Sequence, residues 1–148
     1  MDGRQIVDLV DQRWELLQEL TRLADQQAVA IEQGRMSELL SILRRKQPPL
    51  ETLDRLSLEF RQRCAPPQAI RWSSADERDA CRAKNEACQR LHEALLRREA
   101  ECEAQLQASR QCVEEQLTRS EGAKRAVGSY HASRPSPTTG GQLDLASL

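Results

Sequence analysis

The chain has 148 residues, of which 23 are Asp or Glu and 22 are Lys or Arg, so its formal net charge is −1. This balance provides no sustained electrostatic field that would steer nucleic acid or an acidic ligand, and nucleic acid is therefore not expected as a partner. With 39% hydrophobic residues but only two Trp, one Tyr and one Phe, the composition favours a slim bundle of long helices, with a core of Leu, Ile, Val, Ala and Cys, over a compact globule.

The amino-terminal segment, MDGRQIVDLVDQRW, alternates charged and apolar residues and has no continuous apolar core of the kind found in secretory signals. No stretch of the sequence approaches the ~18 apolar residues that a membrane-spanning helix needs. We therefore expect a cytosolic protein that does not insert into membranes. The five cysteines include no Cys-x-x-Cys pair, which predicts neither a disulfide framework nor a zinc site.

Two periodic segments predict a helical hairpin. Apolar residues recur at steps of three and four over residues 4–33 and again over residues 37–63. Gly34 is suited to closing the first helix, and Ser37 followed by Glu38 is a start signal for the second. Helices joined by so short a connection are expected to pack antiparallel. The predicted apolar stripe of the second helix is Leu39, Ile42, Leu43, Leu50, Leu53, Leu56 and Phe60.

Two proline pairs follow the start of the second helix. Pro48 and Pro49 fall inside the apolar stripe, where each removes a backbone donor, so we expect a break near residues 48–49. Because the apolar spacing resumes in phase, this break is interpreted as a kinked or restarted helix and not as a domain boundary. Pro66 and Pro67 come after the stripe has ended, and they indicate the true connection to the next helix.

A third helix is predicted over residues 75–125. Ser74 and Glu77 have the spacing of a capping box at its start. Polar residues interrupt its stripe around Asn85 and around Arg98 and Glu99. Asn85 is expected either to fix the register between helices or to face solvent. The stripe itself consists of Cys81, Cys88, Leu91, Leu95, Cys102, Leu106, Val113 and Leu117.

From residue 128 the composition changes to Gly, Ser, Thr and Pro, which predicts a disordered tail over residues 128–148. Leu143, Leu145 and Leu148 in this segment either form a docking motif or have no binding role. The predicted fold is all-α: an antiparallel helical hairpin within a three-helix, coiled-coil-like bundle over residues 1–127, with one long C-terminal helix and a disordered tail.

Motifs for catalysis were sought and not found. The sequence contains no Gly-x-x-x-x-Gly-Lys, Gly-x-Gly-x-x-Gly, His-Glu-x-x-His or Gly-x-Ser-x-Gly. Of the two histidines, His131 lies in the predicted tail, and His92 with Cys88 one turn away supplies half of a four-ligand zinc site. Cys81 and Cys102 share a helix face with Cys88 and are interpreted as small buried hydrophobes. We therefore predict neither an enzyme nor a bound cofactor or metal.

The segment AIEQGRMSELLSILRRKQPPLETLDRLSLEF resembles the most recognisable stretch of the FlgN family of flagellar export chaperones. In that family an apolar helix is followed by a Gly at the turn, and then by leucines, a lysine and further leucines in the second helix. The size of the chain, its long last helix, Tyr130 just beyond that helix and the tail are also similar. The Pro48-Pro49 pair and the abundance of cysteine depart from the family. The matching positions are Ala30, Gly34, Leu39, Leu43, Lys46, Leu50 and Leu53.

This resemblance implies a cytosolic chaperone that binds the C-terminal helices of flagellar hook-associated proteins and delivers them to the type III export gate. An apolar stripe that continues beyond its partners makes Leu106, Val113 and Leu117 the candidate contacts for an amphipathic client helix. In the family, a tyrosine near the end of the last helix is implicated in docking on the cytoplasmic domain of the export gate. Tyr130 is the residue of this sequence that matches it.

Two other classes of protein remain open at this point. A structural coiled coil would bury the same stripe permanently in a homodimer. A helical adaptor of another secretion or signalling system would use a similar hairpin.

Overall fold

The computed structural model describes residues 2–64 and 66–132. The elements are α1 (Gly3–Glu32), α2 (Met36–Arg63), a short 3₁₀ helix η1 (Pro67–Ala69) and α3 (Ala75–Ala132). Among the described residues, the β-structure is a single isolated bridge between Asp2 and Arg71. The predicted all-α fold is therefore confirmed. The chain divides into two compact units, Met1–Leu106 and Gln107–Leu148, which are described separately below.

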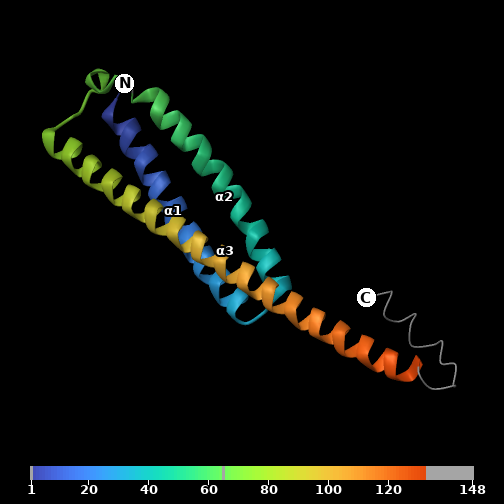
Figure 1. Ribbon diagram of the computed structural model, residues 1–148. Coiled ribbons are helices and arrows are strands. Elements are labelled where there is room, and N and C mark those ends of the chain that lie inside the picture. Colours follow the sequence, from blue (N-terminus) through green and yellow to red (C-terminus); the bar gives the residue numbers. More distant parts are fainter. Residues whose placement is uncertain (1, 65, 133–148) are drawn as a thin grey trace. The chain divides into compact units, whose positions relative to one another are not determined.

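In the first unit, α1 and α2 form the predicted antiparallel hairpin (Figure 1). Gly34 closes α1 with a positive φ of 68°, a conformation that glycine adopts without steric cost. The amide of Arg35 donates to the Ala30 carbonyl at 2.9 Å, which satisfies one of the last carbonyls of the helix. A turn of this kind reverses the chain within a few residues, so the two helices pack along most of their lengths.

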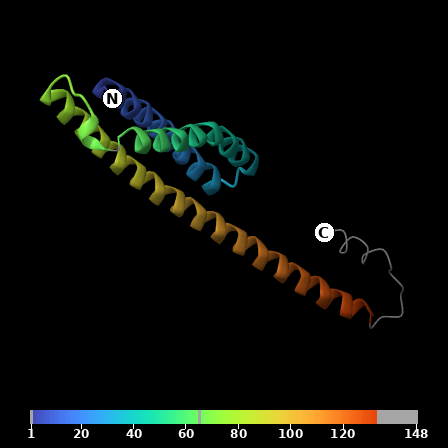
Figure 2. The same ribbon diagram turned by 90° about the horizontal axis from the view of Figure 1, so that it is seen from above.

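The helix α2 runs through Pro48 and Pro49 as one continuous element, so the expected break is wrong (Figure 2). The two prolines remove the donors that would reach the carbonyls of Arg44 and Arg45. Both arginines are exposed, so water can hydrogen-bond these carbonyls instead. In addition, the Thr52 hydroxyl donates to the Pro48 carbonyl at 3.0 Å.

The connection after α2 returns the chain to the start of α1. The amide of Gly3 donates to the Arg71 carbonyl at 2.7 Å, and Asp2 caps α1 through its side chain. A Cβ atom placed on Gly3 would lie 2.5 Å from Cε3 of Trp72. Only glycine fits this close approach without displacing the Trp72 ring.

The helix α3 begins with the predicted cap, because the Ser74 hydroxyl accepts a hydrogen bond from the Glu77 amide at 3.1 Å. Within the first unit α3 runs parallel to α1 (Figure 1). Two ion pairs at successive levels give this direction: Lys84 pairs with Asp11, and Arg98 pairs with Asp25 at 3.3 Å.

The end of α3 differs from the prediction. The helix passes both Gly122 and Gly128 and continues to Ala132, so residues 128–132 are helical and not part of a tail. An isolated glycine costs a helix only about 1 kcal/mol relative to alanine. The good helix formers Glu121, Ala123 and Lys124 flank Gly122. The remainder of the predicted tail, residues 133–148, lies outside the described residues.

The core of the first unit is aliphatic and includes three cysteines. Cys81, Cys88 and Cys102 are buried and free, as expected for small hydrophobes in a helix seam. Burial raises the pKa of all three thiols. The two buried clusters are Ile6, Val10, Leu17, Leu20, Ala24, Leu53, Cys81, Cys88 and Leu95, and then Leu23, Ala30, Ile31, Leu39, Ile42 and Cys102.

One part of the predicted α2 stripe is wrong. Leu43 and Leu50 are 40% and 38% exposed, whereas Lys46 and Pro49 are buried. Leu43 and Leu50 each follow a buried residue directly, so they lie about 100° further around the helix. The core-facing series advances by steps of three and four through Leu39, Ile42, Lys46, Pro49, Leu53 and Leu56.

Candidate partner-binding surface

A buried polar contact links all three helices of the first unit. Lys46 Nζ on α2 donates to Gln27 Oε1 on α1 at 2.8 Å and forms an ion pair with Glu99 on α3. The side chain of Lys46 is 6% exposed and that of Glu99 is 33% exposed. Glu99, although polar, therefore has a structural role in the seam. It neutralises the buried ammonium group of Lys46 and fixes the register of α3 relative to the hairpin.

A second polar contact distinguishes between the two alternatives for Asn85, which were a role in helix register and exposure to solvent. This residue is half-buried, and its Oδ1 accepts a hydrogen bond from Arg13 Nη1 on α1 at 3.3 Å. Arg13 also reaches Gln89 Oε1 at 3.5 Å. Asn85 thus faces α1 and not solvent, which is the arrangement that the register alternative requires.

The second unit presents exposed apolar side chains on α3. Val113, Leu117 and Val127 are 54%, 57% and 56% exposed. Val113 and Leu117 are four residues apart and share a helix face. Leu106, the last residue of the first unit, is 38% exposed. All three predicted positions are therefore accessible, and Val127, which sequence reasoning missed, continues the same pattern of exposed aliphatic residues.

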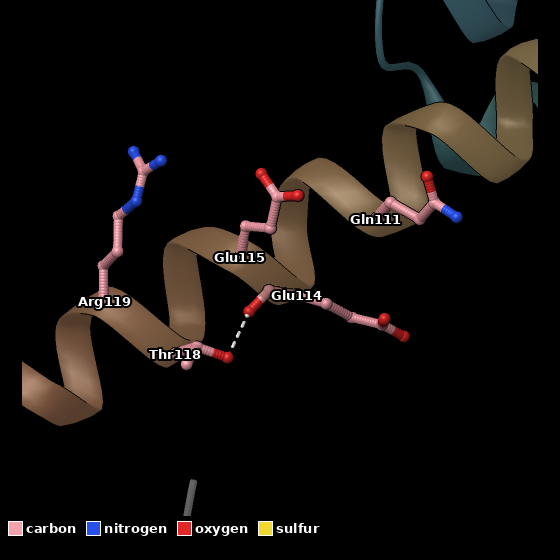
Figure 3. Close-up of a pocket in the computed structure, with 5 residues that line it drawn as sticks. All are labelled: Gln111, Glu114, Glu115, Thr118 and Arg119. Carbon is pink, nitrogen blue, oxygen red and sulfur yellow. Dashed lines mark hydrogen bonds between the residues drawn. The ribbon is translucent and has the colours of Figure 1, made fainter.

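Polar side chains surround Val113 and Leu117. Figure 3 shows Glu115 and Arg119 projecting to one side of the helix and Gln111 and Glu114 to another. Arg110 Nε lies 3.1 Å from Glu114 Oε1 in an exposed ion pair. The polar residues of this shallow depression are all exposed, so it resembles the rim of a protein-protein contact more than an enclosed small-molecule pocket. The residues that line it are Gln111, Glu114, Glu115, Thr118 and Arg119.

A further row of apolar side chains lies on the outer face of α2. It includes the two leucines that the sequence analysis assigned to the core, and its spacing of four, three and seven residues could have identified it as a second stripe. The row consists of Met36, Leu40, Leu43 and Leu50, which are 46%, 57%, 40% and 38% exposed.

Tyr130 falls within α3, in the turn before Ala132, and its side chain lies outside the described part of the chain.

The pair Cys88 and His92, which the sequence analysis considered as half of a zinc site, is not brought together around a ligand site. Cys88 Sγ instead contacts the Val10 carbonyl oxygen at 3.8 Å. Within residues 2–64 and 66–132, no group of three or more His, Cys, Asp or Glu side chains is arranged to hold a metal ion. No helix in this part of the chain is long and apolar enough to cross a membrane.

These features define a class of protein: a helical hairpin completed by a long third helix, with rows of exposed aliphatic side chains suited to contacting other helices. The family model described as FlgN protein matches residues 1–136, and the chain belongs to the FlgN family. Membership confirms the resemblance found in the sequence and identifies the chain as a flagellar export chaperone in general terms. Comparison with curated proteins and with solved structures found no match.

Proposed function

We propose that this chaperone binds the C-terminal helices of flagellar hook-associated proteins on the α3 face that carries Val113 and Leu117, with Leu106 as an additional contact. The observation that carries the proposal is the exposure of Val113 and Leu117, 54% and 57%, on one face of a helix. Aliphatic side chains left open at helical spacing match the anchor positions of an amphipathic helix. The chaperone then acts in the cytoplasm, before export, and its action requires no chemical step.

The test replaces both side chains: Val113→Asp together with Leu117→Asp. Covering the exposed part of each side chain contributes roughly 1 to 1.5 kcal/mol, so the affinity for a hook-associated protein is expected to fall at least 30-fold. Because both residues are exposed, helicity measured by circular dichroism should remain nearly unchanged. The matched control is Gln116→Asp with Ser120→Asp, which adds the same charge to exposed polar positions, also four residues apart, on the same helix.

Calorimetric titration with purified hook-associated proteins distinguishes the outcomes. Parent-like affinity in the Val113→Asp, Leu117→Asp variant would contradict the proposed client site. An equal loss in the control would show that added negative charge, and not the apolar face, caused the effect. Loss of helicity together with binding would show that these residues stabilise the fold.

We also propose that Tyr130 docks on the cytoplasmic domain of the export gate, as the family resemblance implies. A single aromatic ring offers a large contact area with few rotatable bonds to order, which suits a transient handover. Tyr130→Ala should weaken binding to the gate domain while leaving the melting temperature and the client affinity unchanged. Equal gate affinity of the parent and Tyr130→Ala would refute the docking role without affecting the client site.

The exposed row on α2 supports a second candidate function, a structural homodimeric coiled coil. Leu43 and Leu50 are seven residues apart, which is the repeat of a coiled-coil seam. Sedimentation at decreasing concentration separates the two functions. A permanent coiled coil remains dimeric, whereas the chaperone is expected to be monomeric and to form a 1:1 complex with its client.

A further inference from the structure

A groove between α1 and α2 lies on the side of the hairpin that α3 does not cover. Its volume is about 750 Å³, and every residue that lines it belongs to α1 or α2. On α1, Asp25 pairs with Arg98 of α3 at 3.3 Å. Leu16 and Leu23, which line the groove, precede Asp25 by nine and two residues, so they lie about 180° and 160° around α1 from that contact. A further helix could therefore pack on this side of the hairpin.

The groove is open because α2 presents short side chains to it. Pro48, Pro49 and Thr52 line the α2 side, and none of them extends as far from the helix as a leucine or an arginine. The Thr52 hydroxyl donates to the Pro48 carbonyl at 3.0 Å, so it is satisfied within its own helix. Leu23 and Pro49 are buried and Leu16 is half-buried, which makes the floor apolar.

The rim of the groove carries one arginine on each helix. Arg22 of α1 and Arg45 of α2 are exposed, and neither forms an ion pair with another described residue. Glu19 also lines the groove, so two guanidinium groups stand against one carboxylate. A guanidinium group can hold a carboxylate through two parallel hydrogen bonds. The rim is therefore complementary to a segment that carries a carboxylate on each border.

The dimensions of the groove fit a short helix. Its lining residues on α1 extend from Leu16 to Gln26, ten positions or about 15 Å, which is the length of about three helical turns. Leucines at steps of three and four on such a helix would face the apolar floor. Acidic residues on both borders of that apolar face would meet Arg22 and Arg45. We propose that the α1–α2 groove is a second docking surface, which binds an acidic amphipathic helix of a partner protein.

The proposal goes beyond client binding, because neither Val113 nor Leu117 lines the groove. The two surfaces share no residue, so the chaperone would hold a client on α3 and the acidic helix in the groove at the same time. The proposal also gives the proline pair a role. Pro48 and Pro49 depart from the family pattern, and their short rings leave room for the docked helix.

The test titrates the full chain with a synthetic helical peptide of about three turns, with leucines at steps of three and four and glutamates on both borders. The amide resonances of Glu19, Leu23 and Thr52 should shift. A control peptide in which lysines replace the glutamates should bind at least tenfold more weakly. The Val113→Asp, Leu117→Asp variant should bind the glutamate peptide as the parent does, which separates this test from that of the client site.

A charge reversal addresses the rim. Arg22→Glu with Arg45→Glu should reduce the affinity for the glutamate peptide at least tenfold and raise the affinity for the lysine peptide. The matched control is Arg55→Glu with Arg61→Glu, which makes the same charge change at exposed positions of α2 outside the groove and should alter the affinity by no more than about twofold.

A filled groove provides an independent check. Thr52→Phe places a ring where the peptide would lie, so it should weaken binding of the glutamate peptide without changing any charge, while circular dichroism reports whether the helices remain intact. Equal affinity for the glutamate and lysine peptides, or equal losses in the rim variant and its matched control, would overturn the proposal. Loss of peptide binding in the Val113→Asp, Leu117→Asp variant would place the peptide on α3 and would also overturn it, leaving the client site unaffected.

Discussion

Loss of Glu99 should destabilise the first unit more than loss of Lys46, although the two side chains form one ion pair. Glu99→Leu leaves the Lys46 ammonium, which is 6% exposed, with Gln27 as its remaining partner. Breaking a buried pair by removing one partner typically costs 3–5 kcal/mol, and we take about 3 kcal/mol because Glu99 is 33% exposed and water can partly replace it.

Lys46→Met has a different cost. It removes the buried charge, and the Glu99 carboxylate can turn to water. The remaining penalty is the lost hydrogen bond to Gln27, about 1 kcal/mol. The double variant, Lys46→Met with Glu99→Leu, should also lie within about 1 kcal/mol of the parent, because apolar side chains of similar volume replace an ion pair at little net cost. The two changes should therefore be non-additive by about 3 kcal/mol.

Urea unfolding followed by tryptophan fluorescence measures these values. Trp14 and Trp72 both pack against the core of the first unit, so the signal reports that unit and not the rest of α3. Equal losses for the two single variants, or a double variant whose loss is the sum of theirs, would refute the view that the penalty comes from a stranded buried ammonium.

Two further predictions concern packing and the backbone. Gly3→Ala should cost roughly 1 to 3 kcal/mol in the same assay because its Cβ would lie 2.5 Å from the Trp72 ring, whereas Gly122→Ala, with nothing within 4 Å, should raise helicity in circular dichroism; an unchanged Gly3→Ala stability would show that the connection moves freely. Leu53→Ala, at a position 4% exposed, should cost roughly 2 to 5 kcal/mol, and Leu43→Ala, at a position 40% exposed, less than about 0.5 kcal/mol. The reverse order would mean that the core face of α2 has been assigned wrongly.

Much of the fold could be predicted from local patterns. The three- and four-residue spacing of apolar side chains predicts the helices, and Gly34 and Ser74 mark a turn and a cap that depend only on neighbouring backbone groups. The candidate positions Val113 and Leu117 also follow from spacing, since a stripe that continues along α3 is visible without knowing what covers it. Charge balance and the absence of catalytic motifs likewise depend on composition and order alone.

Other features depended on contacts between distant residues. The sequence of α2 contains two apolar rows about 100° apart, and only the position of α1 and α3 decides that Leu39 and Leu53 are buried while Leu43 and Leu50 are exposed. Lys46 belongs to the buried row because Gln27 and Glu99 approach it from two other helices. A helical pattern records which residues share a face, but the free energy of burying a charge depends on partners that the pattern does not contain. For that reason the seam of this chaperone, unlike its helices, required the tertiary structure.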